Sequence, residues 1–227
     1  MRAWNPNRDK READLIWKLG SLEAGSKVLD APSGWGRIAN ELALAGADVL
    51  GVDSSAATVE RGRGMFPDVT FEIRDLRNLE GAGRFDVVLF WGTTFGVFDD
   101  KTDHGILATA CELLEPGGRL IVATFNGPHL LRETMVLPKG RTSALLLPDR
   151  ALIDTRKFSP DGRRIHAEQV IYHGEVRVED QYSIRAFSVP ELEFWLTSAG
   201  FSSVDFFDRK GEPFTHESAD IIAVATK

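Results

Sequence analysis

Residues 30–37 read DAPSGWGR, between the short strand-like stretch KVL and the apolar-periodic stretch that continues to residue 45. A strand that ends in an acid, followed by the spacing G-x-G and a helix, is typical of a backbone loop that holds a nucleotide. Gly34, Gly36 and Ala39 also satisfy the dinucleotide pattern G-x-G-x-x-G/A. This stretch therefore predicts an α/β fold, and its glycines alone leave two kinds of cofactor open.

The position of Asp30 favours one of the two cofactors. In a dinucleotide site the strand leads almost directly into the first glycine, which leaves the helix N-terminus to a pyrophosphate. Here four residues, 30–33, precede Gly34, and the first of them is a carboxylate. A carboxylate repels a diphosphate but attracts a cationic amino group, such as the one on the amino acid end of S-adenosylmethionine. The residues therefore favour S-adenosylmethionine.

Composition limits the class of protein. The chain has 227 residues, which suits one α/β domain or a domain with a modest insertion. Its formal net charge is -7 without a long Lys/Arg run, which argues against a nucleic acid as the main partner. The single cysteine, Cys111, excludes an internal disulfide framework. No apolar run approaches the about 20 residues that span a bilayer, and the N-terminus lacks a signal-peptide core, so we expect a soluble cytoplasmic protein without membrane contact.

Strand and helix patterns alternate along most of the chain, which predicts parallel pairing with right-handed crossovers. Expected helices cover residues 7–22, 35–45, 55–65, 103–114 and 189–201. Expected strands cover residues 27–31, 47–53, 69–75, 85–91, 119–125, 201–207 and 219–226. The stretch EPGG at 115–118 is expected to turn the chain. The pattern predicts a doubly wound sheet.

Residues 141–187 break this rhythm. Three stretches, 144–158, 163–173 and 175–187, are strand-like and are separated by the turn-type sequences SPDG and HG. We expect an antiparallel sheet inserted into a core formed by residues 1–140 and 188–227. The insertion is predicted to be either a lid over the site or a dimerisation surface, and a homodimer is a possible assembly. Its apolar residues alternate with charges as in a sheet with one covered face: Leu145, Leu147, Ile153, Ile165, Val170, Ile171, Val176 and Val178.

Five motifs in order resemble the class I S-adenosylmethionine-dependent methyltransferases of small-molecule type. VLDAPSGWG is similar to their first motif, VLGVDSS to the second and FEIRDL to the third. FDVVLFWGTTFGVF resembles the fourth, and LLEPGGRLIVATFN resembles the motif that ends the fifth strand. The resemblance covers residues 10–227 apart from the insertion. It implies a Rossmann-like, seven-stranded, mainly parallel sheet in which the last two strands form a hairpin that carries one reversed strand.

The resemblance also implies roles for individual residues. Asp30 would accept a hydrogen bond from the methionine amino group, Asp53 would bind both ribose hydroxyls, and Asp75 would accept from the adenine amino group. A helix cap or a turn is the alternative role of each acid. Pro32 departs from the commonest pattern, which has a glycine at this position. The proline removes an N–H donor and fixes φ. The cofactor-binding residues that the resemblance implies are Asp30, Ala31, Pro32, Gly34, Gly36, Asp53, Ser54, Asp75, Leu76 and Trp91.

The methyl acceptor and its catalytic residues are less defined by the sequence. Positioning and exclusion of water can accomplish much of methyl transfer, and a base is needed only when the nucleophile carries a proton. Thr93, Thr94, Phe95 and Phe98 follow the fourth expected strand and are candidates for lining the acceptor pocket. No residue cluster has metal-ligand spacing, so no metal site is expected. The candidate catalytic residues are His129, Thr94 and Arg185, where Arg185 would anchor an acidic substrate group or form a salt bridge of the lid; His104 is expected to be a surface or capping residue.

Three functions remain open on the sequence. The leading one is methyl transfer from S-adenosylmethionine to N, O or C of a small-molecule metabolite. An enzyme of the same fold that uses this cofactor without transferring methyl is the second. A nicotinamide-dependent oxidoreductase is the third.

Overall fold

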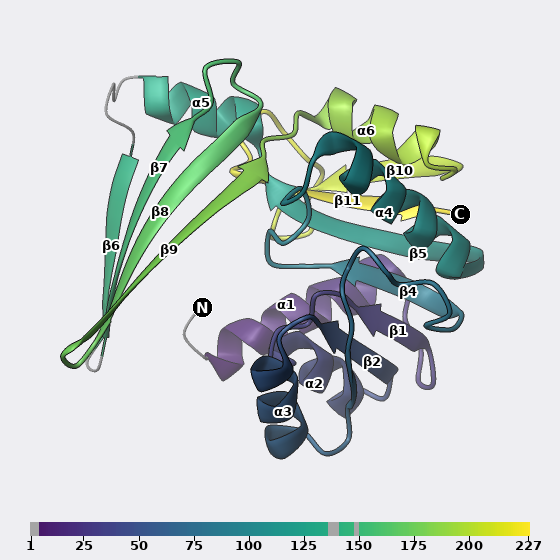
Figure 1. The fold of residues 1–227 in the computed structure, drawn as a ribbon. Helices are drawn as coiled ribbons and strands as arrows, with labels where there is room; N and C mark the ends of the chain where they lie inside the picture. The colour runs from purple at the N-terminus through teal and green to yellow at the C-terminus, as the bar shows by residue number, and fades with distance from the viewer. Residues whose placement is uncertain (1–4, 136–140, 148–149) are drawn as a thin grey trace.

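The computed structural model describes residues 5–135, 141–147 and 150–227. It contains a seven-stranded core sheet and a separate four-stranded sheet that stands beside it (Figure 1). The strands of the core sheet are β1 (Lys27–Asp30), β2 (Asp48–Asp53), β3 (Thr70–Ile73), β4 (Phe85–Phe90), β5 (Leu114–Phe125), β10 (Ser203–Phe207) and β11 (Asp220–Thr226). The helices are α1 (Pro6–Gly20), α2 (Arg37–Leu44), α3 (Ala56–Met65), α4 (Asp100–Leu113), α5 (Gly127–Met135) and α6 (Val189–Ser198).

The core sheet has the strand order β10-β11-β5-β4-β1-β2-β3. The neighbours from β5 to β3 pair in parallel, whereas β11 pairs antiparallel with both β5 and β10. The predicted fold class and the predicted terminal hairpin with one reversed strand are therefore confirmed. Within the described ranges, no helix has the length and apolar character needed to cross a membrane.

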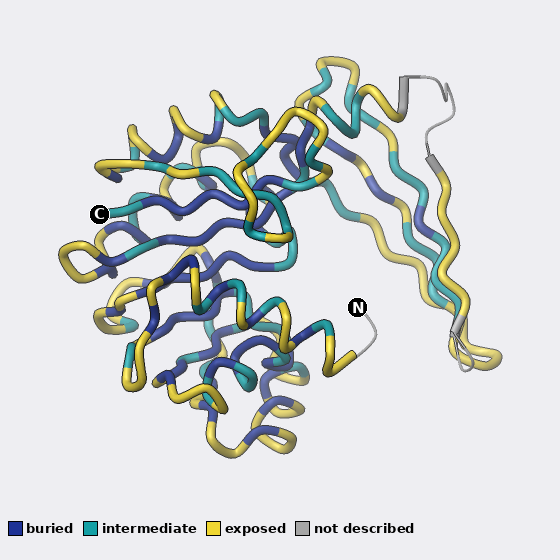
Figure 2. The backbone as a smooth tube through the Cα atoms, turned by 180° about the vertical axis from the view of Figure 1, so that it is seen from behind, coloured by how far each residue is buried: buried dark blue, intermediate teal, exposed yellow. Residues whose placement is uncertain are grey.

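Helices cover both faces of the core sheet. The helices α1, α2 and α3 lie on one face, and α4 and α6 lie on the other (Figure 1). Side chains of a strand alternate between faces, so Val87 and Leu89 of β4 pack toward the first group while Val88 and Phe90 pack toward the second. All four are fully buried, which accounts for the continuous apolar run in this strand. Figure 2 shows this buried centre in dark blue.

Two local predictions about the core need correction. The stretch EPGG does not separate a helix from a strand, because β5 already begins at Leu114 and pairs there with Phe85 before the register shifts. Helix α5 was not predicted at all. It begins with Gly127 and Pro128 and has only nine residues, which is short for a periodic pattern to be recognised.

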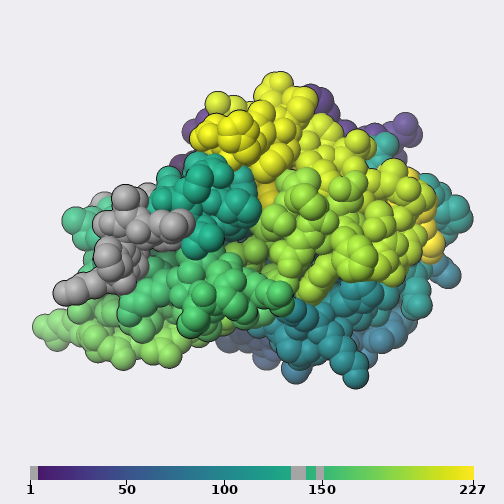
Figure 3. Space-filling model, turned by 90° about the horizontal axis from the view of Figure 1, so that it is seen from above, coloured from purple at the N-terminus to yellow at the C-terminus, as the bar shows by residue number. Residues whose placement is uncertain are grey.

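The inserted sheet contains four antiparallel strands rather than the three expected stretches. Its strands are β6 (Arg141–Leu147), β7 (Arg150–Phe158), β8 (Arg164–His173) and β9 (Val176–Arg185), in that spatial order. The first expected stretch divides into two strands, and the residues between them, 148 and 149, lie outside the described ranges. Seen from above, the sheet extends sideways from the core (Figure 3).

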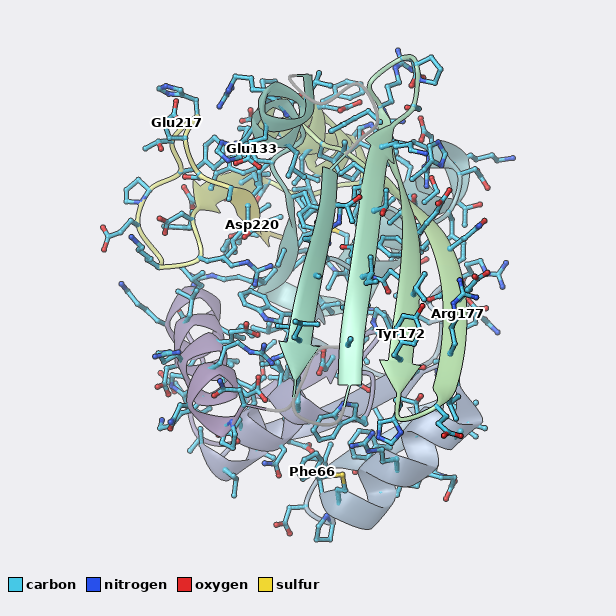
Figure 4. All side chains as sticks on the ribbon, turned by 90° about the vertical axis from the view of Figure 1, so that its left-hand side faces the viewer. Phe66, Glu133, Tyr172, Arg177, Glu217 and Asp220 are labelled. Carbon is cyan, nitrogen blue, oxygen red and sulfur yellow. The ribbon has the colours of Figure 1, made fainter. Side chains whose placement is uncertain are left out.

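One face of the inserted sheet is turned toward the core. Residues that pair directly across the strands share a face, so Leu145, Leu152, Ile171 and Val178 belong with the buried Ile165 at the base. The opposite face carries Tyr172 and Arg177, which Figure 4 shows on the side away from the core. The expected alternation is therefore only partly right. Ile153 and Val170 are paired with each other on the outer face.

Candidate functional site

The carboxyl ends of the parallel strands bring the predicted site residues to one edge of the sheet. Asp30 ends β1, Asp53 ends β2, and Trp91 and Asn126 directly follow β4 and β5. The order of the sheet places β1 between β2 and β4, so these ends are neighbours in space. In doubly wound sheets, ligands bind at this edge, where the strand order reverses.

Asp30 is a buried carboxylate beneath the glycine loop, only 2% exposed. Burial raises its pKa to about 7, because desolvation outweighs the positive charge of Arg37, and the neighbouring Asp53 raises the pKa further. Within the described ranges, no Lys or Arg forms a salt bridge with this carboxylate. A cationic amino group bound next to this buried carboxyl group would stabilise the ionised form of Asp30.

The glycine loop is held by the end of β2. The Gly34 amide donates to Oδ2 of Asp53 at 3.0 Å, and the Ser55 amide donates to Oδ1 of the same carboxylate at 2.9 Å. Gly34 has φ +58, and a Cβ built on it would have no heavy atom within 4 Å. The loop therefore leaves open space above Gly34, as a loop that cradles a ligand requires. Ser54 is exposed at this point, and Ser55 caps α3.

Gly36 is required for a different reason than the sequence suggested. A Cβ at this position would lie 2.3 Å from Cζ of Phe71, so the missing side chain makes room for an aromatic ring of the core. Ala31 is fully buried and its amide donates to the carbonyl of Leu89, so its side chain also serves packing. The Ala31–Pro32 peptide is cis, and Pro32 is half-buried in the loop.

Asp75 follows β3 at the same edge, but its carboxylate already has a partner. Arg77 donates to it through Nε at 2.9 Å and through Nη2 at 2.6 Å, and its guanidinium lies 5.0 Å from the ring centroid of Phe98. The hydrogen bonds from Arg77 lower the pKa of Asp75 to about 2. Leu76 is buried in the core. A role for Asp75 toward adenine stays a prediction, and it would have to share the carboxylate with Arg77.

Trp91 is at the expected place along the chain, and its indole is directed toward α1. The ring is 4% exposed, and its Nε1 donates to Oε2 of Glu12 at 2.9 Å. Glu12 also accepts from Nη1 of Arg37 at 2.8 Å. Burial alone would raise the pKa of Glu12, but the hydrogen bond from Trp91 and the charge of Arg37 outweigh it, so the pKa is lowered. Trp91 thus links the edge of the sheet to the N-terminal helix.

The loop after β4 contains one strained residue. Thr93 has φ 65, which is uncommon for a β-branched residue, and its hydroxyl is buried without a hydrogen-bond partner among the described residues. Strained backbone of this kind is often found at functional sites. The hydroxyl of Thr94 donates to the carbonyl of Trp91 at 3.1 Å. Phe95 is fully buried between the rings of Phe90 and Phe187, so it belongs to the core rather than to a pocket.

Arg185 does not anchor a substrate in this structure. Its guanidinium is bonded to Asp100 and Glu191, and its side chain is 5% exposed. It also lies over the ring of Trp195, 5.3 Å from the centroid. Arg185 therefore joins the base of the inserted sheet to α4 and α6, which agrees with the salt-bridge alternative.

The two candidate histidines occupy different surroundings. His129 lies at the start of α5, where its Nε2 is 3.5 Å from a carboxylate oxygen of Glu133. Its Nδ1 is buried without a hydrogen-bond partner in the described part of the chain. His104 hydrogen-bonds to Ser198 of α6 at 2.9 Å. His129 is therefore at the carboxyl edge, and His104 has a structural contact.

The charged residues of α1 and of the loop after β10 were not among the residues predicted for the site. Glu12 and Arg37 are 25 positions apart, and Arg209 reaches the same place from the far end of the chain, 5.8 Å from the ring centroid of Trp91. No local motif relates these residues. The periodicity of α1 indicated which face is apolar, and the pairing of its charges depends on tertiary contacts.

Comparison with known proteins supports the assignment of the fold. The family model described as a methyltransferase domain matches residues 28–118, which include β1 to the first part of β5. A demethylmenaquinone methyltransferase of Beutenbergia cavernae is 34% identical over 121 residues, which cover 51% of this chain and 49% of that protein. The matched region thus spans about half the length of this curated relative.

Solved methyltransferase structures match nearly the whole chain. The CcbJ methyltransferase of Streptomyces caelestis superposes with a TM-score of 0.80 at 24% identity, over 99% of this chain and 92% of that chain. The amino pentose methyltransferase CalS10 of Micromonospora echinaspora, solved with S-adenosylmethionine bound, gives 0.72 at 16% identity over 100% and 92%. The inserted sheet therefore belongs to the shared architecture. Residues 28–118 thus match the methyltransferase domain family, and the chain as a whole shares the fold of solved methyltransferases.

Proposed function

We propose that this chain transfers a methyl group from S-adenosylmethionine to N, O or C of a small molecule. The observation that carries the proposal is the pairing of a buried carboxylate, Asp30, with open space above the left-handed Gly34. Asp30 supplies a partner for the cationic amino group of the cofactor. The space above Gly34 supplies room for the amino acid end of the cofactor. The curated relative and the amino pentose enzyme are methyltransferases by name.

S-adenosylmethionine, when bound, supplies an electrophilic methyl group whose bond to sulfur breaks as the acceptor's lone pair forms the new bond. The residues of this chain hold the two reactants in line. We propose that Asp30 fixes the amino acid end and that Asp53, whose carboxylate also accepts from the Gly34 and Ser55 amides, binds the ribose hydroxyls. Because positive charge on the sulfonium is lost during transfer, a dry site of fixed geometry favours the reaction without an acid.

His129 is the residue we propose as proton acceptor for nucleophiles that carry a proton. It follows β5 at the carboxyl edge, and the carboxylate of Glu133 lies 3.5 Å from its Nε2. A proton on Nε2 facing Glu133 leaves the lone pair of Nδ1 available, and no hydrogen-bond donor of the described chain occupies it. Thr93 and Thr94 lie on the neighbouring loop and are proposed to line the acceptor pocket.

The inserted sheet, residues 141–187, is proposed to be a lid over this edge. Its base contacts the loop after β4, because Arg164 donates to the carbonyls of Gly96 and Phe98 at 3.0 and 2.9 Å. The Arg185 amide also donates to the Gly96 carbonyl, at 2.7 Å. The sheet thus starts beside the loop after β4, and the face that carries the buried Ile165 is turned toward the core. A cover in this position would exclude water from the methyl acceptor.

Cofactor affinity is expected to rise between pH 5.5 and 7.5. Asp30 has a pKa of about 7 instead of 3.8, and the cationic amino group favours its ionised form. Affinity for S-adenosylhomocysteine, which carries the same amino group, should therefore fall by about tenfold per pH unit below 7. Calorimetric titration in two buffers of different ionisation enthalpy should also detect release of a proton on binding.

Asp30→Asn is the control for this titration, because an amide does not titrate. Its affinity should be weak and independent of pH, and a variant that kept the pH dependence would contradict the assignment to Asp30. The stability of the free protein depends on pH with the opposite sign to that of the cofactor affinity. The folded chain retains the Asp30 proton up to about pH 7 while the unfolded chain releases it near 3.8, so the contribution of Asp30 to the free energy of unfolding decreases as the pH rises across this interval.

A homodimer formed through the outer face of the inserted sheet is also proposed, in the cytoplasm and without a nucleic acid or membrane partner. Leu146 on this face is 76% exposed and Tyr172 is 36% exposed. Leu146→Glu should convert the dimer into a monomer in sedimentation velocity, whereas Leu145→Glu on the inner face should not. A wild-type protein that sediments as a monomer would disprove the dimer.

Cofactor and turnover assays test the proposed function. The full chain should bind S-adenosylmethionine and S-adenosylhomocysteine in calorimetric titrations, and it should not bind nicotinamide dinucleotides. Incubation with a metabolite library should then release S-adenosylhomocysteine in the presence of an acceptor. Binding of the nicotinamide cofactor alone would indicate an oxidoreductase, and S-adenosylmethionine binding without any methylated product would favour a different use of the cofactor.

A further inference from the structure

A cleft of about 580 Å³ lies between α1 and the first residues of the loop that joins β10 to β11. It is lined by Arg8, Arg11, Glu12, Leu15, Arg209 and Lys210. The loop is close to the helix here, because a Cβ on Gly211 would lie 2.6 Å from Cδ1 of Leu15. Four of the six lining residues are cations and one is an acid, in a chain whose net charge is -7.

The cleft adjoins the carboxyl edge of the core sheet. Its wall residue Glu12 accepts hydrogen bonds from Trp91, which follows β4, and from Arg37, which follows the glycine loop. Arg209 forms the opposite wall, with its guanidinium 5.8 Å from the Trp91 ring centroid. Asp220, labelled in Figure 4, begins β11 at this same edge. Nε of Arg209 donates to its carboxylate at 2.6 Å. The cleft is therefore a neighbour of the proposed acceptor site rather than a remote surface feature.

Arg209 has donors that the described chain does not satisfy. Its Nη1 and Nη2 are buried, and neither has a hydrogen-bond acceptor among the described residues. The carboxylate of Glu12 lies 3.9 Å from Nη1, which is an ion-pair distance beyond a hydrogen bond. Buried guanidinium donors without acceptors are costly, and a carboxylate or phosphate matches the fork of an arginine with two oxygens.

We propose that this cleft binds the anionic group, a carboxylate or a phosphate, of the methyl acceptor. The inference rests on the proposed methyltransferase function and adds the substrate class. Arg209 is the central ligand, and Arg11 and Lys210 on the rim raise the local concentration of anions. The carboxylate of the cofactor is the other possible source of an anion here. We assign that group to Arg37 instead, because Arg37 directly follows the glycine loop and its charge acts on Asp30.

Inorganic phosphate is the probe for the first test. Nuclear magnetic resonance of the full chain, saturated with S-adenosylhomocysteine, should show saturable shifts of amides in α1 and in residues 208–211. Arg11→Gln together with Lys210→Gln should weaken phosphate binding by about tenfold, because two of the four positive charges that attract the anion to the cleft are removed. Both residues are exposed, so this variant should fold. The exposed pair Lys101→Gln with Arg163→Gln removes the same charge elsewhere and should leave phosphate affinity unchanged within about twofold.

Cofactor titration distinguishes the two sources of the anion and separates this inference from the proposed function. Affinity for S-adenosylhomocysteine should be the same in both double variants and should not depend on phosphate. Competition between phosphate and S-adenosylhomocysteine would assign the cleft to the cofactor and overturn the proposal. Equal phosphate affinity in all variants would overturn it as well. A chain that fails to bind S-adenosylmethionine at all would instead disprove the proposed function, whatever the phosphate result.

Turnover provides the second test. In a library screen read by release of S-adenosylhomocysteine, acceptors with a carboxylate or phosphate should react, and phosphate should inhibit competitively against them. The Arg11 and Lys210 double variant should raise the KM of such an acceptor about tenfold with little change in kcat, because binding rather than chemistry is altered. Reaction with neutral acceptors alone, or inhibition by phosphate that is not competitive with the acceptor, would contradict the proposal.

Discussion

Replacing Gly34 by valine is expected to reduce affinity for S-adenosylmethionine by about tenfold to a hundredfold. The Cβ at this position points into open space above the loop, which is where the cofactor is proposed to lie. Forcing extra atoms into a filled site costs about 1–3 kcal/mol. Calorimetric titration with S-adenosylmethionine and S-adenosylhomocysteine measures the loss.

Gly174 offers a matched control for this substitution. It has φ 59 against 58 for Gly34, and a Cβ on it also meets nothing within 4 Å, but it lies in the turn between β8 and β9. Valine at either position is strained by roughly 1–2 kcal/mol, because both are in the left-handed region. The two variants should therefore lose similar thermal stability, while only Gly34→Val loses cofactor affinity. Equal affinity of Gly34→Val and the wild type would show that the cofactor does not pass above this loop.

Removing the inserted sheet should abolish turnover while leaving cofactor binding intact. The excision has to end before Ile184, since Arg185 and Phe187 belong to the core: Arg185 is bonded to Asp100 and Glu191, and Phe187 stacks on Phe95. Residues 141–183 would be replaced by a short flexible linker. Loss of the cover should lower kcat/KM for an identified acceptor by about a hundredfold or more, because misplaced reactants and admitted water both slow the transfer.

Two point variants test in the intact fold whether the inserted sheet is a lid. Ile171 and Val170 are consecutive, half-buried residues of β8 that point to opposite faces of the inserted sheet. Ile171→Glu places a charge on the face toward the core and should impair turnover strongly, whereas Val170→Glu places it on the outer face and should have a small effect. Cofactor affinity serves as the folding control for both. Full activity of the excised protein, or equal effects of the two point variants, would contradict a lid and favour an assembly role for this sheet.

The sequence alone was sufficient for the order of the core strands and most of their helices, and for the position of the glycine loop between β1 and α2, although it did not predict α5 or the division of the first inserted stretch into β6 and β7. Both depend on local patterns: the apolar strands alternate with amphipathic helices, and an acid followed by spaced glycines lies between β1 and α2. Parallel strands then place Asp30 and Asp53 at the same edge without further information. The reversed hairpin of β10 and β11 came from the family resemblance, and the structure confirms it.

Only the tertiary structure decided where the long side chains point and which residues they bind. Trp91 lies where the sequence placed it, but its indole is bonded to Glu12, 79 positions away. Arg185 was a candidate substrate anchor, and it is bonded instead to Asp100, 85 positions away, and to Glu191. No local pattern records such pairs, because each is set by how helices and loops pack over the sheet rather than by the spacing of neighbouring residues.

The two glycines of the first motif also show what the sequence predicts and what only the tertiary structure decides. Both Gly34 and Gly36 were expected from the sequence to make room for the cofactor. Gly34 does face open space, but Gly36 lacks a side chain because the ring of Phe71, from β3, occupies that position. The sequence by itself determined that a strand, an acid and a glycine-containing loop lie at the carboxyl edge of the core sheet, since these follow from local backbone chemistry. Only the tertiary structure decided which of the two glycines faces open space. It also brought together the cations of the cleft, Arg8, Arg11, Arg209 and Lys210. The physical reason is that contacts between distant segments form when the apolar faces of the helices and the sheet are buried together.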